Sequence, residues 1–466
     1  MTDGNKLVEN LITYAKENLY LNINDEDFLR LRLYKFFLLK TSDIKKYKGS
    51  GELLPTEKLS AVLRDFLVTN FSLTGGADEA VSEVFALLTP MPSQIDRNFK
   101  YLREKMGAKA AIDYFYGISS ANTFVTEENY SGEIANEKFF SHIYFSDKKR
   151  GGLDHLDTDI RFQDNARVVN FENSGRNYSF GYLKYGDAFE HAALALPYEK
   201  SQVIDREMLD DVTSFVEYLP EYAAISSVCG KTGDNIALTD KFFLLKGEMP
   251  IYSAKVGNIL RSEYYPDAEI YVCEYPVSTV RFVTFSRNTV IELTHDLLRS
   301  WDNYTDMTCK ILGNVKHGAN RSFVLIRMLS DGRFSVDVMF TDADDFDLYT
   351  KKTPFDSLLT TRYFPTALCG RFIMDESAAR ATVFAKKYLQ KKGKVNVEEN
   401  CPQYAELLAR AAEEQMFSSN EKKVAQTIND NLLSKCDSFL RSVSAFSKSD
   451  NPALSLRKFL AVLGIK

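Results

Sequence analysis

The chain has 466 residues, of which 45% are hydrophobic and 26% are charged, a composition that excludes a disordered protein. Its length allows two or three packed units. A formal net charge of −6 provides no overall basic field for a phosphate backbone, so nucleic acid is not an expected partner.

Three features of the chain bear on its compartment. The N-terminus is amphipathic and lacks the apolar core of a signal peptide, and no apolar run is long enough to cross a membrane. The six cysteines are widely spaced and form no C-x-x-C, which indicates reduced thiols and no disulfide framework. We therefore expect a cytoplasmic protein with no membrane partner.

Residues 1–125 form a predicted helical N-terminal region. Two apolar stripes recur at helical spacing, and Asn24 and Thr56 are placed as N-caps of the second and third helices. The stripes consist of Leu7, Val8, Leu11 and Ile12, and of Phe28, Leu31, Tyr34 and Leu38.

Residues 126–390 form a predicted core with two sheet-containing halves, because apolar residues there alternate with a period of two. The expected strands are Arg167–Glu172, Tyr178–Tyr185, Ala192–Pro197, Ile270–Phe285 and a hairpin that turns at Asp331-Gly332. Helices are expected at Asp205–Leu219 and Asn288–Trp301. Residues 391–466 are again helical, so the predicted fold class is α+β.

Five segments of the chain carry distinctive motifs. They are LLTPMPS with AIDYFYGIS within Leu87–Ser119, FGYLKYGDAFEHAALAL at Phe180–Leu196, FVEYLPEY at Phe215–Tyr222, EYPVSTVRF at Glu274–Phe282 and RKFLAVLGIK at the C-terminus. These motifs resemble those of the class II galactose-1-phosphate uridylyltransferase family. The resemblance covers nearly the whole chain and implies a histidine-triad-like fold of antiparallel sheets with flanking helices. The family transfers a uridylyl group between UDP-glucose and galactose 1-phosphate through a uridylyl-histidine, and its members are often dimeric.

The family's active-site string, His-Asp-His-Phe-Gln, is altered in this chain. The segment Ala237–Pro250 aligns with it without a gap and has Thr239, Asp240, Lys241 and Phe243 at the first, second, third and fifth positions. Both histidines and the amide donor are therefore replaced. A lysine is charged near neutral pH unless it is desolvated, so Lys241 is a poor nucleophile, although a phosphoramidate on lysine stays open.

The family's metal-ligand strings are also missing. No C-x-x-C lies between Glu127 and Asp159, and no histidine lies between Lys351 and Arg362. We expect no metal of the family type and no cofactor.

Five residues remain as candidate ligand contacts. Asn165 and Arg167 resemble the entry to the family's nucleotide-binding strand, Glu190 and His191 its Glu-His pair, and Arg281 its strand arginine. Arginines could hold a phosphate by charge-assisted hydrogen bonds. The alternatives, a solvated or paired arginine and a structural hydrogen bond at His191, stay open.

Two functions follow from the resemblance. The first is a degenerate homologue that binds a sugar phosphate, a UDP-sugar or a protein partner, with a homodimer expected. The alternative is an active uridylyltransferase acting between UDP-glucose and a hexose 1-phosphate with rearranged residues such as Lys241, Asp240 and His191.

Overall fold

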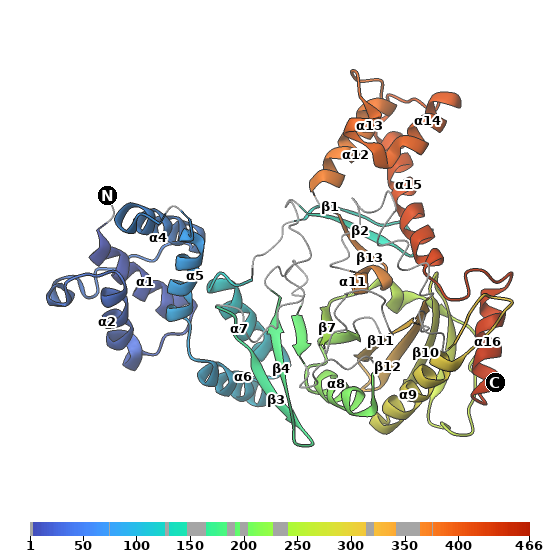
Figure 1. Ribbon diagram of the computed structural model, residues 1–466, viewed down its shortest axis with the longest axis horizontal. Helices are drawn as coiled ribbons and strands as arrows, with labels where there is room; N and C mark the ends of the chain where they lie inside the picture. The colour runs from blue at the N-terminus through green and yellow to red at the C-terminus, as the bar shows by residue number, and fades with distance from the viewer. Residues whose placement is uncertain are drawn as a thin grey trace. The chain divides into compact units, whose positions relative to one another are not determined.

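The computed structural model divides the chain into two compact units (Figure 1). The first unit comprises Met1–Glu127 and Thr158–Ala195, and the second comprises Glu128–Asp157 and Leu196–Lys466. The structure describes residues 3–73, 75–125, 130–146, 165–183, 192–195, 204–226, 241–313, 321–341, 364–374 and 376–466.

The first unit is mainly helical. Its helices are α1 (Gly4–Asn18), α2 (Glu26–Phe36), α3 (Ile44–Tyr47), α4 (Thr56–Phe71), α5 (Ala77–Leu88), α6 (Pro92–Met106) and α7 (Ala108–Ala121). The stripe of Leu7, Val8, Leu11 and Ile12 is buried along α1, as predicted. Burial of this stripe supplies the hydrophobic contribution that holds α1 among the other helices.

The predicted second stripe is wrong at Phe28, Leu31 and Leu38, which are exposed, and right at Tyr34, which is buried. In α2 the buried residues are Leu29, Arg30, Leu33 and Tyr34, while Phe28 is 67% exposed. The reason is a buried ion pair: Arg30 Nε donates to Glu9 Oε1 of α1 at 2.7 Å. An arginine on the inner face turns the neighbouring apolar residues outward, which apolar periodicity alone does not reveal.

Both predicted N-caps are displaced by one residue. A 3-10 turn, Ile23–Asp25, precedes α2, and the N-cap of α2 is Asp25 rather than Asn24. Thr56 is the first residue of α4, and Pro55 occupies the N-cap. A proline there is compatible with a helix start, because the cap does not need a backbone donor.

A three-stranded antiparallel arrangement completes the first unit. Strands β3 (Val169–Asn173), β4 (Arg176–Tyr182) and β5 (Ala192–Ala195) lie in that order. The run Asn173–Asn177, with its Gly175, predicts a hairpin turn between the first two strands. The structure confirms it, since Ser174 and Gly175 have φ angles of 51° and 79°. These left-handed values match a two-residue hairpin turn.

The second unit is built around a large antiparallel sheet. Within the described residues the strand order is β7 (Lys241–Lys246), β6 (Tyr222–Ser226), β11 (Arg321–Met328), β12 (Phe334–Thr341), β10 (Ser278–Thr284), β9 (Glu269–Glu274) and β8 (Lys255–Val256). A smaller sheet contains β1 (Tyr130–Ile134), β2 (His142–Ser146) and β13 (Arg371–Met374), and β13 pairs in parallel with β2.

Helices cover both faces of the large sheet. Helices α8 (Arg206–Tyr218), α9 (Arg287–Asn303) and α16 (Pro452–Val462) contact β11, β12 and β10. The opposite, inner face packs into an apolar cluster that includes residues of α11 (Phe364–Leu368), α12 (Glu376–Leu389), α14 (Ala405–Glu413) and α15 (Glu421–Ser442). The short α13 (Val397–Asn400) and the 3-10 helix η5 (Pro250–Ser253) complete this layer.

One predicted strand is two strands. The run Ile270–Phe285 is interrupted between β9 and β10, which pair with each other in antiparallel fashion. Pro276 lies in the interruption and lacks a backbone N–H, so it cannot donate to a sheet ladder.

The predicted α+β class is confirmed, with antiparallel sheets between helical terminal regions. The predicted hairpin at Asp331-Gly332 and the helices after Asp205 and before Trp301 are also present. The boundaries proposed after residues 125 and 390 stay a prediction. Among the described helices, none is both long and apolar enough to span a bilayer.

Candidate functional site

The altered active-site string runs into β7, which pairs with β6 in the large sheet. Lys241 is the first residue of β7, and its side chain lies outside the described part of the structure. Thr239, Asp240, Glu190 and His191 also lie outside the described residues.

Phe243 is described, and it lies on the inner face of the sheet. Its side chain is partly buried and packs against the apolar cluster, which contains Ile225 and Ile251. The position at which the family carries an amide donor is therefore part of a hydrophobic contact in this chain.

A single row of side chains joins Phe243 to Arg281. Across the sheet, Phe243 lies opposite Ile225, Ile225 opposite Leu325, Leu325 opposite Asp337 and Asp337 opposite Arg281. Directly opposed residues in antiparallel strands project from the same face. Two of the residues singled out in the sequence, Phe243 and Arg281, are thus brought to one face.

Arg281 is buried, and its donors are used within the protein. Its Nε donates to Asp337 Oδ1 at 2.6 Å and its Nη2 to Asp337 Oδ2 at 3.1 Å. The same guanidinium donates to the carbonyls of Ile251 at 2.7 Å and Tyr252 at 3.3 Å. Arg281 therefore links η5 to the sheet through hydrogen bonds. Burial lowers the pKa of the Arg281 guanidinium, but the attraction of Asp337 outweighs burial and the pKa is raised.

Arg327 lies beside this pair, but its guanidinium contacts an aromatic ring instead of a carboxylate. It follows Leu325 by two residues on β11, so it projects from the same inner face. Its guanidinium carbon lies 4.1 Å from the centre of the Tyr252 ring, a cation–π contact. Its Nε is buried and has no hydrogen-bond partner in the described ranges. Burial lowers the pKa of Arg327, with Asp337 acting in the opposite sense.

Neutral donors and thiols surround these arginines. Within the described part of the chain, the buried hydroxyls of Tyr252 and Ser335 have no hydrogen-bond partner, and burial raises the pKa of the Tyr252 phenol. Burial also raises the pKa of Cys273 to about 12 and that of Cys369 above its usual value, so neither thiol is a ready nucleophile. The site is rich in donors and suits an oxyanion rather than a metal ion.

Asn165 and Arg167 belong to the first unit. Asn165 exchanges two hydrogen bonds with Asn122, at 2.6 and 2.8 Å, through their side-chain amides and backbone carbonyls. Arg167 donates to the carbonyl of Ala86, in the last turn of α5, at 2.9 Å and to that of Pro90, just beyond α5, at 3.0 Å. In this arrangement both side chains hold the backbone of their own unit.

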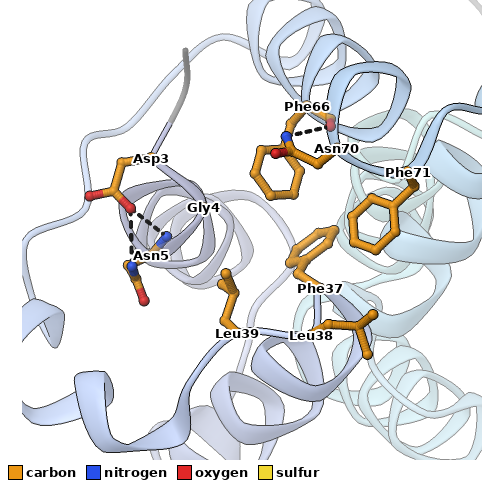
Figure 2. Close-up of a pocket in the computed structure, with 9 residues that line it drawn as sticks. All are labelled: Asp3, Gly4, Asn5, Phe37, Leu38, Leu39, Phe66, Asn70 and Phe71. Carbon is orange, nitrogen blue, oxygen red and sulfur yellow. Dashed lines mark hydrogen bonds between the residues drawn. The ribbon is translucent and has the colours of Figure 1, made fainter.

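A pocket of about 500 Å³ also lies in the first unit (Figure 2). Apolar side chains line it together with Asp3, Asn5 and Asn70, and no basic residue is among the described residues of its lining. Asp3 at its rim accepts from the backbone and side chain of Asn5, at 2.9 and 3.1 Å, and Asn70 Nδ2 donates to the Phe66 carbonyl at 2.8 Å. Its described lining therefore offers a phosphate no charged donor, and the Asp3 carboxylate opposes an anion. The apolar walls are Phe37, Leu38, Leu39, Phe66 and Phe71.

A second hollow, of about 560 Å³, lies in the second unit beside β2 and η5. His142 lines it, half-exposed, with Nδ1 3.7 Å from Glu133 Oε1, and burial lowers the pKa of this imidazole. Lys138 and Lys255 line it together with two glutamates, so its charges are mixed. Within the described ranges, no three His, Cys, Asp or Glu side chains gather as a set of metal ligands.

Sequence reasoning missed Asp337, Arg327 and Tyr252. The sequence contains a signal for two of them. Arg327 and Asp337 are charged residues in mainly apolar strands, and each lies two positions from an inward-facing residue, so each also faces inward. A charged residue at such a position needs a partner or a ligand. Only the strand register reveals that Asp337 pairs with Arg281 and not with Arg327.

Comparison with known proteins agrees with the motifs. The chain is 20% identical over 381 residues to a galactose-1-phosphate uridylyltransferase of Lactococcus lactis subsp. lactis, covering 73% of this chain and 76% of that protein. It is 20% identical to galactose-1-phosphate uridylyltransferase 2 of Streptococcus pneumoniae serotype 4, and that match covers 56% of this chain and 59% of the relative.

Among solved structures, the yeast Ap4A phosphorylase in complex with AMP aligns with a TM-score of 0.37 and 11% identity, over 61% of this chain and 87% of the other. No family model matches the chain. In sequence, this protein is similar at low identity to galactose-1-phosphate uridylyltransferases.

Proposed function

We propose that this protein is a uridylyltransferase-like protein that binds a sugar phosphate or a UDP-sugar without transferring the uridylyl group. The observation that carries the proposal is Phe243, which packs into the apolar cluster where a transferase of this kind requires an amide donor. Thr239 and Lys241 replace both histidines of the string, so the nucleophile is also missing.

Retention of the ligand is supported by the composition of the inner face. Arg281 is paired with Asp337, but Arg327 Nε and the hydroxyls of Ser335 and Tyr252 have no hydrogen-bond partner among the described residues. Oxyanions are the ligands that such a face attracts. The relatives are named for galactose 1-phosphate, which carries such a group.

The test is a calorimetric titration of the full chain with UDP-glucose, UDP-galactose and galactose 1-phosphate, followed by mass spectrometry of the intact protein. We expect saturable binding and no uridylyl adduct. An adduct on Lys241 would establish the alternative, an active transferase with rearranged residues. Absence of binding to all three compounds would contradict the proposal and would point to a protein partner or a second copy of the chain.

A further inference from the structure

The inner face of the second unit contains a group of donors with no acceptor. Arg327 Nε, the Ser335 hydroxyl and the Tyr252 hydroxyl are each buried, and none of them has a hydrogen-bond partner among the residues that the structure describes. Buried polar atoms are nearly always bonded in native proteins, so a group of three needs an explanation.

The three side chains are close together because of the strand register. Arg327 on β11 lies directly opposite Ser335 on β12, and opposed residues of antiparallel strands have Cβ atoms about 5 Å apart. Tyr252 of η5 covers Arg327, with 4.1 Å between the guanidinium carbon and the ring centre. Ser335 is only 1% exposed, so bulk water does not satisfy its hydroxyl.

The charge of Arg327 is not balanced by its neighbours. Asp337 is the nearby buried carboxylate, and both of its oxygens already accept from Arg281. Arg281 opposes a further positive charge at Arg327, and Glu248 attracts it only as a minor influence from an exposed position. Among the residues that the structure describes, no carboxylate forms an ion pair with Arg327.

We propose that Arg327, Ser335 and Tyr252 form a binding site for a phosphoryl oxyanion. A guanidinium whose face rests on an aromatic ring keeps its N–H edges free, and these edges match two oxygens of a phosphate. The hydroxyls of Ser335 and Tyr252 supply further donors. This inference deepens the proposed function, on which the identity of the natural ligand rests, but the oxyanion site itself is testable with inorganic phosphate.

The experiment compares the full-length wild type with Arg327→Met, Arg327→Lys and Ser335→Ala. Arg333→Met is the matched control, because Arg333 on the same hairpin is paired with Asp331 at 2.8 Å and Glu269 at 3.2 Å. Thermal unfolding is followed in sodium phosphate against sodium chloride of equal ionic strength. Calorimetry with galactose 1-phosphate and UDP-glucose provides the dissociation constants.

We expect phosphate to raise the Tm of the wild type and of Arg333→Met, and not that of Arg327→Met. The Kd for a phosphorylated ligand should rise about 10- to 100-fold in Arg327→Met and less in Ser335→Ala, since a hydrogen bond to a charged group is the stronger one. The Kd of Arg327→Lys should lie between those of the wild type and Arg327→Met, because lysine keeps the positive charge but loses the planar pair of donors. In chloride, Arg327→Met should be at least as stable as the wild type, since it removes an unbalanced charge.

The outcomes separate the two proposals. Phosphate stabilisation that depends on Arg327, together with no binding of either sugar compound, would uphold the site and contradict the proposed function. Binding of UDP-glucose with equal Kd in wild type, Arg327→Met and Ser335→Ala would overturn the site and leave the proposed function intact. If Arg327→Met does not fold in chloride, Arg327 has a structural role and the site is likewise refuted.

Discussion

Arg281 and Asp337 face each other on the adjacent strands β10 and β12, and the guanidinium reaches both carboxylate oxygens, at 2.6 and 3.1 Å. Because Asp337 is fully buried, replacing it leaves a buried arginine without its counter-charge. We predict that Asp337→Asn lowers the free energy of unfolding by about 3 kcal/mol, measured by urea denaturation.

The control for this variant is Asp331→Asn. Asp331 also pairs with an arginine, Arg333, at 2.8 Å, but its side chain is 48% exposed and lies at the hairpin turn. An exposed pair contributes at most about 1 kcal/mol, so this change should be nearly silent. If Asp337→Asn and Asp331→Asn lower the free energy of unfolding equally, burial of the Arg281–Asp337 pair does not increase its contribution to stability.

Phe243 provides a direct test of the altered active-site string. We predict that Phe243→Gln, which restores the family's residue, destabilises the protein by about 2 kcal/mol, because it places an amide in an apolar contact. Phe285→Gln, at a side chain that is 71% exposed, is the matched control and should change stability little. A Phe243→Gln variant as stable as the wild type would argue that this position still accommodates an amide donor.

Asp302 predicts a pH dependence of stability. It lies near the end of α9, and burial raises its pKa to about 6 from an ordinary value of 3.8. The folded state therefore retains the proton that the unfolded state releases, and stability falls as the pH rises from about 4 to about 6.

The variant Asp302→Asn should remove this penalty. Since the side chain is partly exposed, we discount the effect and expect a gain of about 1 kcal/mol at pH 7.5, with no gain below pH 4. Unfolding is measured by denaturant at both pH values. A gain that is the same at the two pH values would show that ionisation of Asp302 is not its cause.

Arg30 and Glu9 form the corresponding buried pair of the first unit, with side chains that are 2% and 1% exposed. Arg30→Met should destabilise the protein by about 3 to 5 kcal/mol, because Glu9 is then buried without its partner. The double variant Glu9→Gln/Arg30→Met should recover part of that loss. If the double variant loses the sum of the two single losses, the pair is not coupled.

Elements determined by local sequence could be predicted, and elements determined by distant residues could not. The α+β class, the α1 stripe and the Ser174-Gly175 turn were predictable, because local periodicity and left-handed turn residues determine them. The buried face of α2 was not, because it depends on the distant Glu9.

The candidate site shows the same division. The altered string at Thr239–Phe243 is visible in the sequence, and Arg281 was singled out by its motif. Its partner Asp337 and the unbalanced Arg327 become apparent only when β10, β12 and β11 are placed in register. Non-local pairing of this kind has no counterpart in the spacing of residues along the chain.

The parallel pairing of β2 with β13 has a consequence for biosynthesis. His142 and Arg371 are register partners, although they lie far apart in the chain. The β1–β2 hairpin therefore leaves the ribosome with the β2 edge unpaired, and β13 can pair with this edge only after most of the second unit has been synthesised. Slow translation or a truncated message would prolong the exposure of this edge, and chaperone binding or aggregation of nascent chains is expected to begin there.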